Sequence, residues 1–228
     1  MKKLIIIPAF NEQESILGTV SRIRELAPDY DYIVVNDCSE DDTLMICRRN
    51  HIRVLNLPIN LGIGGAVQTG YRYAYENGYE IAVQMDGDGQ HDPAYLSVLE
   101  EALVKDGLDM VIGSRFIDNQ GFQSSTIRRV GIRFFTALLL LLFGQKITDA
   151  TSGMRMCNRR VMELFIRDYP RDYPEPETVA RLLRHRFGVR EVPVMMRERQ
   201  GGVSSISMKK SIYYMMKVSM AILIERLR

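Results

Sequence analysis

The sequence predicts an α/β protein with a mostly parallel central sheet flanked by helices, followed by an amphipathic C-terminal helix. Short apolar runs alternate with segments of helical periodicity over the first 115 residues. Polar or glycine-rich residues follow each of the predicted strands in that part of the chain. The 228 residues, 46% of them hydrophobic and 25% charged, are typical of a globular protein with a real core. This length suits one α/β domain with a small appendage.

The expected elements follow from periodicity, capping residues and turn residues. The strands are predicted at residues 4–8, 32–35, 52–57, 80–85, 109–112 and 191–196. The helices are predicted at residues 14–26, 43–49, 64–77, 93–105, 128–143, 177–187 and 207–228. Residues 118–127 are predicted to form a loop, and residues 149–155 a polar turn. We expect a domain at 1–205, with a nucleotide-binding half at 1–115 and an acceptor-binding half at 116–205, and a separate helix at 206–228.

The cysteines and the length of the apolar runs indicate the cellular compartment in which the protein is expected. The three cysteines form no CxxC pair and no disulfide framework, which favours a reducing cytoplasm. The longest apolar run, at residues 137–143, is far shorter than the roughly 20 residues that cross a bilayer. We therefore expect no transmembrane helix.

The net charge of +2 conceals a strong asymmetry along the chain. Residues 1–127 carry a net charge of −9, whereas residues 128–228 carry +11. The basic part is expected to face an anionic partner, such as a membrane surface or a phosphorylated substrate. Mutual neutralisation of the two halves within the fold is the alternative. Nucleic acid is not expected, because the basic residues belong to no recognised nucleic-acid-binding module.

Asp86, Gly87 and Asp88 directly follow the strand predicted at residues 80–85. Two carboxylates at a strand end, separated by a glycine that permits a tight path, can reach one divalent cation. Hard oxygen ligands of this kind suit Mg2+ or Mn2+. Gln90 and His91 are placed to complete or border the site. The alternative is a solvent-exposed turn, in which Asp and Gly are common because they favour turn conformations.

Two further segments are candidates for nucleotide binding. Asp37 ends the strand predicted at residues 32–35, where a carboxylate can accept hydrogen bonds from a ribose or a nucleobase, or can cap a helix. Gly62 lies in the glycine-rich segment NLGIGG, which precedes a predicted helix. Its backbone N–H groups can face a phosphate, although a simple turn explains the segment equally well.

The order of six motifs carries a family resemblance. The segments PAFNE, VNDCSEDDT, NLGIGGA, QMDGDGQHDP, GSRF and DATSGMR occur in this order between residues 4 and 205. This pattern resembles a family 2 glycosyltransferase with the GT-A fold. It is most similar to the dolichol-phosphate mannose synthase group, which transfers a sugar from a nucleotide sugar to a polyprenyl phosphate.

The resemblance implies a role for each matching position. The implied nucleotide-binding residues are Pro8, Ala9, Glu12, Asp37, Gly62 and Asp86. The implied metal and diphosphate site is Asp86, Asp88 and Gln90, with Mg2+ or Mn2+. The implied acceptor-phosphate site is Arg115, Arg128 and Arg129, with Ser152, Gly153 and Arg155 near the sugar and acceptor. Arg199 and Ser204 match the loop that is expected to close over the diphosphate.

These roles imply a metal-dependent, inverting displacement in which Asp86, Asp88 and Arg115 are catalytic. A phosphate acceptor is already anionic, so no general base is required to create the nucleophile. One alternative is a family 2 transferase acting on a hydroxyl of a polysaccharide or protein, with Asp149 or Glu175 as the base. Another is a non-catalytic nucleotide-sugar-binding subunit, because Asn36 and Ile63 stand where the family often has Asp and Lys.

Two segments indicate contact with a membrane surface. Arg128, Arg129 and Arg133 precede an apolar run, and the helix predicted at 207–228 carries an apolar stripe within a basic segment. The residues of this stripe are Ile212, Met216, Met220, Leu223 and Leu227. We expect a peripheral protein at the inner face of the cell membrane, with a small membrane protein or a second copy as a further partner. A buried core helix is the alternative for residues 128–143.

Overall fold

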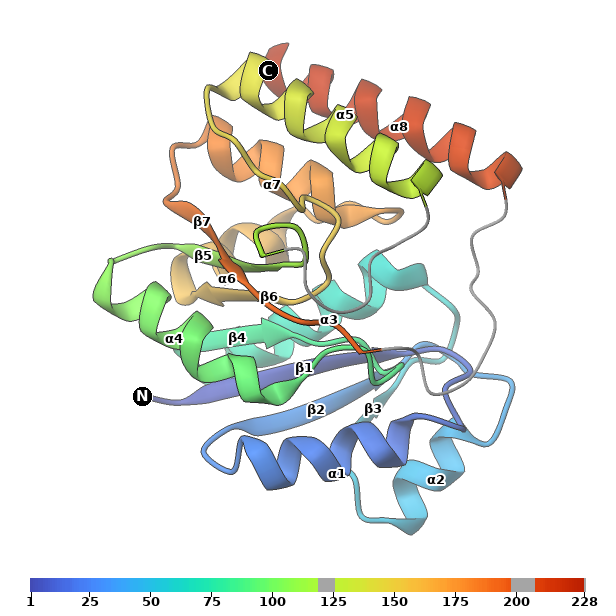
Figure 1. The fold of residues 1–228 in the computed structure, drawn as a ribbon. Helices are drawn as coiled ribbons and strands as arrows, with labels where there is room; N and C mark the ends of the chain where they lie inside the picture. Colours follow the sequence, from blue (N-terminus) through green and yellow to red (C-terminus); the bar gives the residue numbers. More distant parts are fainter. Residues whose placement is uncertain (119–125, 198–207, 228) are drawn as a thin grey trace.

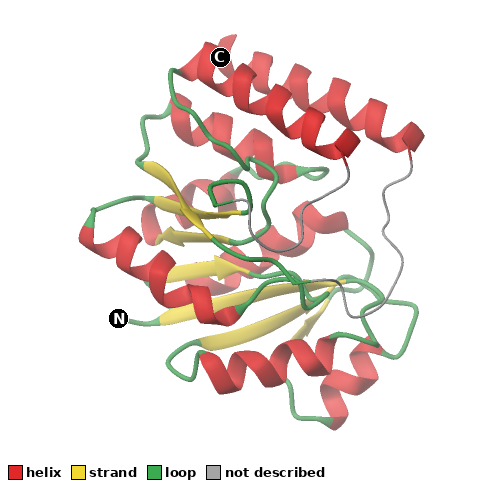
Figure 2. Cartoon of the chain, in the orientation of Figure 1, coloured by secondary structure: helices red, strands yellow, loops and turns green. Residues whose placement is uncertain are grey.

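The central element of this computed structural model is a seven-stranded sheet with helices on both faces (Figures 1 and 2). The structure describes residues 1–118, 126–197 and 208–227, and the side chains of 126–128 and 208–212 are outside that description. The strands are β1 Lys3–Ala9, β2 Asp31–Asn36, β3 Val54–Asn56, β4 Ile81–Gln84, β5 Met110–Ser114, β6 Arg155–Asn158 and β7 Val189–Pro193. Their spatial order is β3-β2-β1-β4-β6-β5-β7.

The sheet is mostly parallel, as predicted, with one reversed strand. Strand β6 runs antiparallel to both β4 and β5, and the other pairings are parallel. Gln84, at the end of β4, pairs with Arg155, at the start of β6. The turn before β6 therefore lies at the edge of the sheet where β4 ends. This reversal brings residues 149–154 to the edge at which parallel sheets bind their ligands.

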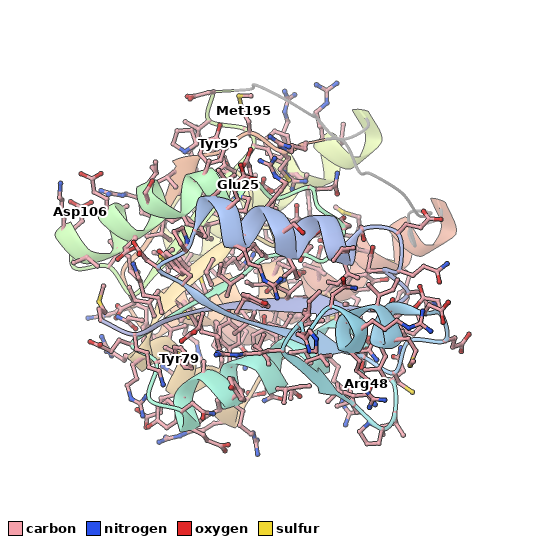
Figure 3. The ribbon with its side chains drawn as sticks, turned by 90° about the horizontal axis from the view of Figure 1, so that it is seen from below. Glu25, Arg48, Tyr79, Tyr95, Asp106 and Met195 are labelled. Atoms are coloured by element: carbon pink, nitrogen blue, oxygen red, sulfur yellow. The ribbon has the colours of Figure 1, made fainter. Side chains whose placement is uncertain are left out.

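The helices cover the two faces of the sheet in separate groups. They are α1 Ile16–Leu26, α2 Thr43–Arg49, α3 Gly62–Glu76, α4 Leu96–Lys105, α5 Thr126–Phe143, α6 Arg159–Arg167, α7 Pro174–Arg184 and α8 Met208–Leu227, with a short 3-10 helix, η1, at Pro93–Tyr95. Helices α1, α2 and α4 pack on one face, on which Ile5 and Ile7 of β1 point inward. In Figure 3, which is seen from below, Glu25 of α1 and Arg48 of α2 are labelled.

The opposite face of the sheet carries two layers of helices. Leu4 and Ile6 of β1 belong to the same core cluster as residues of α3, α6 and α7, so alternate residues of this strand fill the two cores. Helices α5 and α8 lie side by side over α7, at the top of Figure 1. None of the described helices is long and apolar enough to cross a membrane.

A buried ion pair fixes α8 to the domain. Glu225 of α8 is 1% exposed, and its Oε1 accepts a hydrogen bond from Arg181 Nε of α7 at 3.0 Å. Arg184 lies 3.3 Å from the other carboxylate oxygen. Unpaired buried charges are costly, so the position of α8 on α7 is strongly specified.

The predicted elements differ from the structure mainly between residues 144 and 170. Strand β6 begins within the segment predicted as a polar turn, and neither β6 nor α6 was predicted. The strand predicted at 52–57 is reduced to the three residues of β3, and α7 begins three residues earlier than predicted. The loop predicted at 118–127 lies largely outside the described residues.

Candidate active site

The acidic loop, residues 86–91, follows β4 and is held by three hydrogen bonds. Gln84 Nε2 donates a hydrogen bond to Asp86 Oδ1 at 3.3 Å, and the Asp86 backbone N–H donates to His91 Nδ1 at 2.9 Å. Asp88 Oδ1 accepts a hydrogen bond from the Gln90 backbone N–H at 3.0 Å. The Asp86 side chain is 38% exposed, so its carboxylate is open to a ligand.

The glycine of the TSG turn lies directly against Asp86. A Cβ atom at Gly153 would be 2.7 Å from Asp86 Oδ2 and 2.9 Å from Oδ1, closer than real contacts allow. Residues 149–153 therefore approach the acidic loop so closely that any side chain at this position would displace the Asp86 carboxylate.

Replacing Gly153 with alanine is expected to weaken Mn2+ binding about 10- to 100-fold, the usual cost of displacing a group that orients a metal ligand. The obstructed atoms are the free end of the Asp86 side chain, so the carboxylate moves and the fold is retained. Gly188→Ala is the matched control, because its nearest neighbouring atom is at an ordinary 3.4 Å. Mn2+ titration followed by electron paramagnetic resonance measures the effect. Equal affinities for the two variants would contradict this view of the turn.

Arg115 lies on the other side of the same turn. Its Nε and Nη2 donate to the two carboxylate oxygens of Asp149 at 2.6 and 2.7 Å, and Nη2 also donates to Thr151 Oγ1 at 3.0 Å. Burial lowers the pKa of Arg115, but the hydrogen bond and charge of Asp149, together with the charge of Asp86, raise it above its ordinary value. Arg115 is therefore a fixed cation within electrostatic range of Asp86.

Arg155 and Ser152 take structural positions rather than the acceptor-phosphate positions that we expected. Arg155 is 1% exposed, and its guanidinium donates to the carbonyl oxygens of Ala150, Ser152 and Glu175 and to the Thr178 hydroxyl. Ser152 is fully buried, and its Oγ accepts a hydrogen bond from the Met154 N–H. Both side chains hold the turn and the start of α7, and neither presents an exposed group to a phosphate.

The remaining arginines of the expected phosphate site are only partly described. Arg129 lies in the first turns of α5 and is half-buried. The side chain of Arg128 is outside the described residues, as are Arg199 and Ser204.

The predicted nucleotide-binding residues gather at the ends of β1 and β2. The Asp37 backbone N–H donates to the Ala9 carbonyl at 2.9 Å, and Asp37 Oδ1 accepts from the Leu61 N–H at 2.7 Å. Burial raises the pKa of the Asp37 carboxyl above its ordinary value, although the backbone N–H groups of Leu61 and Gly62 oppose this shift. Asp37 thus holds the residue before α3, and the glycine-rich segment forms the first turn of this helix, beginning at Gly62 with a φ of +76°.

The end of β1 also adjoins the acidic loop. The Pro8 carbonyl oxygen would lie 3.1 Å from a Cβ at Gly87, and the Glu12 side chain would also be in contact with it. Glu12 Oε2 accepts a hydrogen bond from Ser15 Oγ at 2.7 Å. The predicted nucleotide side and the acidic loop are therefore neighbours.

Gln90 connects the acidic loop to the chain beyond β7. Its side-chain Nε2 donates to the Arg197 carbonyl at 3.3 Å, and its own carbonyl accepts from the Arg197 N–H at 2.9 Å. The Arg197 guanidinium also pairs with Asp92. Arg197 was not predicted as a site residue, because no local sequence signal connects it with residues more than 100 positions earlier.

The chemistry of the donor set fits Mg2+ or Mn2+. Asp86 and Asp88 supply hard carboxylate oxygens from one loop, and Gln84 Oε1 beside them is a buried acceptor without a hydrogen-bond partner among the described residues. No cluster of three His, Cys, Asp or Glu side chains that could enclose a metal occurs in the described residues. A few carboxylates completed by water and phosphate oxygens are the usual environment of Mg2+.

Asp149, one of the two candidate general bases, is poorly placed for that role. Asp149 is 0% exposed and is ion-paired with Arg115. Its N–H and that of Thr148 both donate to the Glu191 carboxylate at 2.6 Å, which fixes the turn further. An occupied, buried carboxylate cannot collect a proton from an acceptor hydroxyl without first breaking its ion pair.

Comparison with solved structures identifies the class of fold. The chain superposes on glucosyl-3-phosphoglycerate synthase from Mycobacterium tuberculosis in complex with Mn2+, uridine diphosphate and phosphoglyceric acid, with a TM-score of 0.74 and 18% identity, over 99% of this chain and 78% of that one. The fold is therefore the GT-A glycosyltransferase fold, as the motifs predicted.

Sequence comparison identifies the family. Residues 4–165 match the profile of Glycosyl transferase family 2, and the chain belongs to this family. It is 32% identical over 216 residues to the polyprenol monophosphomannose synthase of Mycolicibacterium smegmatis, covering 90% of this chain and 81% of that protein. It is 35% identical over 161 residues to the undecaprenyl-phosphate mannosyltransferase of Micrococcus luteus, covering 68% of this chain and 65% of that protein.

A third relative has a different sugar in its name. The UDP-N-acetylglucosamine–dolichyl-phosphate N-acetylglucosaminyltransferase of Methanococcus voltae is 30% identical over 179 residues, covering 70% of each chain. The chain is therefore similar in sequence both to relatives named for mannose and to one named for N-acetylglucosamine.

Proposed function

We propose that this protein transfers a sugar from a nucleotide diphosphate sugar to a polyprenyl phosphate, with inversion at the anomeric carbon. The observation that carries the proposal is the shared turn at residues 149–153, which touches Asp86 through Gly153 and Arg115 through Asp149. The acidic loop, which suits a metal ion bound to a diphosphate, is therefore next to a fixed cation, Arg115, which suits a second phosphate. The names of the relatives in Mycolicibacterium, Micrococcus and Methanococcus support a lipid phosphate as the acceptor.

Each group of residues has a separate role in an in-line displacement. Asp86 and Asp88 would hold Mg2+ or Mn2+, with Gln90 beside them, and the ion offsets the charge that develops on the leaving diphosphate. Pro8, Ala9, Glu12, Asp37 and Gly62 bind the nucleotide at the ends of β1 and β2. Arg115, held rigid by Asp149, orients the acceptor phosphate with Arg128 and Arg129. The acceptor oxygen attacks without a base, because it is already anionic.

A donor screen tests the proposal. The purified chain is incubated with UDP-, GDP- and TDP-sugars, a polyprenyl phosphate, and Mg2+ or Mn2+, and lipid-linked product is scored. Product from at least one donor, lost on chelation of the metal, is the expected result. Nucleotide sugars that bind but are never transferred to any acceptor would favour the non-catalytic alternative.

The outward surface of the two outer helices fits a peripheral position at the cytoplasmic face of the membrane. We define the α5–α8 face by its exposed apolar side chains, Val130, Phe134, Leu140 and Leu141 of α5 and Met216, Met220, Leu223, Ile224 and Leu227 of α8. The exposed cations Arg133 and Arg226 adjoin them. A broad apolar surface with cationic neighbours is typical of interfacial helices.

Substituting Met216, Met220 and Leu227 together with serine is expected to weaken vesicle binding at least about tenfold, because each fully buried apolar side chain of this size contributes about 1.5–3 kcal/mol. Co-sedimentation with phosphatidylglycerol vesicles measures the binding. The matched control replaces Met45 and Val104, which are exposed apolar residues of α2 and α4 on the other face of the sheet. Unchanged vesicle binding, with a change in self-association instead, would assign the face to a second copy of the chain.

A further inference from the structure

His91 is a buried histidine whose ring is hydrogen-bonded to the first residue of the acidic loop. It is 4% exposed and lies five residues after Asp86. Its Nδ1 accepts a hydrogen bond from the Asp86 backbone N–H at 2.9 Å. A backbone N–H is always a donor, so Nδ1 carries no hydrogen, and the ring hydrogen is on Nε2.

The same ring also lies near the Asp86 side chain. His91 Nε2, to which the backbone contact assigns the ring hydrogen, lies 3.9 Å from Asp86 Oδ2. One imidazole thus contacts the backbone of Asp86 and approaches its side chain.

Two other groups complete the surroundings of this carboxylate. Gln84 Nε2 donates to Oδ1 at 3.3 Å, and Gly153 packs against both oxygens. With His91 Nε2 at 3.9 Å from Oδ2, three neighbouring groups flank the carboxylate. Groups that orient a metal-binding carboxylate commonly affect metal affinity as strongly as some ligands do.

We propose that His91 is a positioning residue that sets the direction in which Asp86 presents its oxygens to a divalent cation. The inference rests on the proposed function only in assigning Asp86 to the cation. His91 touches neither the donor nor the acceptor, and it acts through Asp86 alone. Its substitution therefore changes the affinity of the cation site in the absence of any sugar or lipid.

Two variants separate the two interactions of the ring, and a third is the control. His91→Asn places an amide oxygen near the position of Nδ1, so it retains an acceptor for the Asp86 N–H but loses the group at Nε2. His91→Leu loses both contacts. His185→Leu is the control, because His185 is an exposed histidine at the end of α7.

Titration of each full-length protein with Mn2+ alone, followed by electron paramagnetic resonance, measures the affinity per folded molecule, and thermal unfolding is recorded in parallel. We expect affinity to fall about tenfold for His91→Asn and up to about 100-fold for His91→Leu, and to be unchanged for His185→Leu. A role in stability alone would lower the unfolding temperature and leave the affinity of folded His91→Asn at the wild-type value. That result overturns the proposal, and His91→Asn remains decisive if His91→Leu does not fold.

The titration also separates this inference from the proposed function. A wild-type chain that binds Mn2+ but transfers no sugar would contradict the transferase proposal and leave the order of affinities intact. Equal Mn2+ affinity in all four proteins would overturn the role of His91, whatever the chain transfers.

Discussion

Replacing Asp86 with asparagine is expected to reduce sugar transfer about a thousand-fold, equivalent to about 4 kcal/mol of transition-state stabilisation. The substitution preserves shape and removes the negative charge that a divalent cation needs. Gln84 can still donate to the remaining side-chain oxygen, so little change in stability is expected. Single-turnover transfer with the best donor, together with thermal unfolding, measures both effects.

Asp29→Asn is the control for this prediction. Asp29 is an exposed aspartate just before β2, at the edge of the sheet opposite to the strand ends that carry the site. It undergoes the same chemical change, and its transfer rate should be that of the wild type. If Asp86→Asn retained half of the wild-type rate, the acidic loop would not be the cation site of the reaction.

Replacing Arg115 with methionine is expected to lower the free energy of unfolding by about 3–5 kcal/mol and to abolish transfer to the lipid phosphate. The large cost in stability arises because Asp149, fully buried, would lose its ion-pair partner. Chemical denaturation measures the change in unfolding free energy. Arg53→Met breaks an exposed ion pair with Asp31 and should cost no more than about 1 kcal/mol.

The double variant Arg115→Met, Asp149→Asn separates the structural role of Arg115 from its role with the acceptor. Removing the unpaired charge should restore much of the lost stability, because a neutral buried side chain is far less costly. Transfer should remain absent, since no cation replaces Arg115. A stable double variant with normal transfer would exclude Arg115 from the acceptor site.

Much of the structure of residues 1–115 could be predicted because its signals are local. Strands β1 and β4 are apolar runs bounded by polar residues, and Asp86 and Asp88 follow β4 directly in the chain. Parallel pairing then brings the strand ends together without further information. Gly153 lies beside Asp86, and its distance from the carboxylate is visible only in the structure.

The second half was harder to predict because its signals are not local. Strand β6 has only four residues and begins with Arg155, whose buried guanidinium donates to four acceptors. Two of these acceptors, in Glu175 and Thr178, are 20 and 23 residues away in the sequence. Met216, Met220, Leu223 and Leu227 of the apolar stripe predicted on α8 are exposed, and the side chain of Ile212 is outside the described residues. The inner face of α8 includes the charged Glu225, whose partner Arg181 is 44 residues away in the sequence. No periodicity in α8 alone could indicate that a carboxylate is buried there.

The acceptor itself provides the most direct test of the central claim, which is that the site uses an acceptor already carrying negative charge. The measurement compares transfer from one active nucleotide sugar to a polyprenyl phosphate and to the corresponding polyprenol, under identical conditions. The buried, ion-paired state of Asp149 predicts that only the phosphate is glycosylated and that the product has inverted anomeric configuration. Comparable transfer to the alcohol would contradict the account, because it would require a base that activates a hydroxyl.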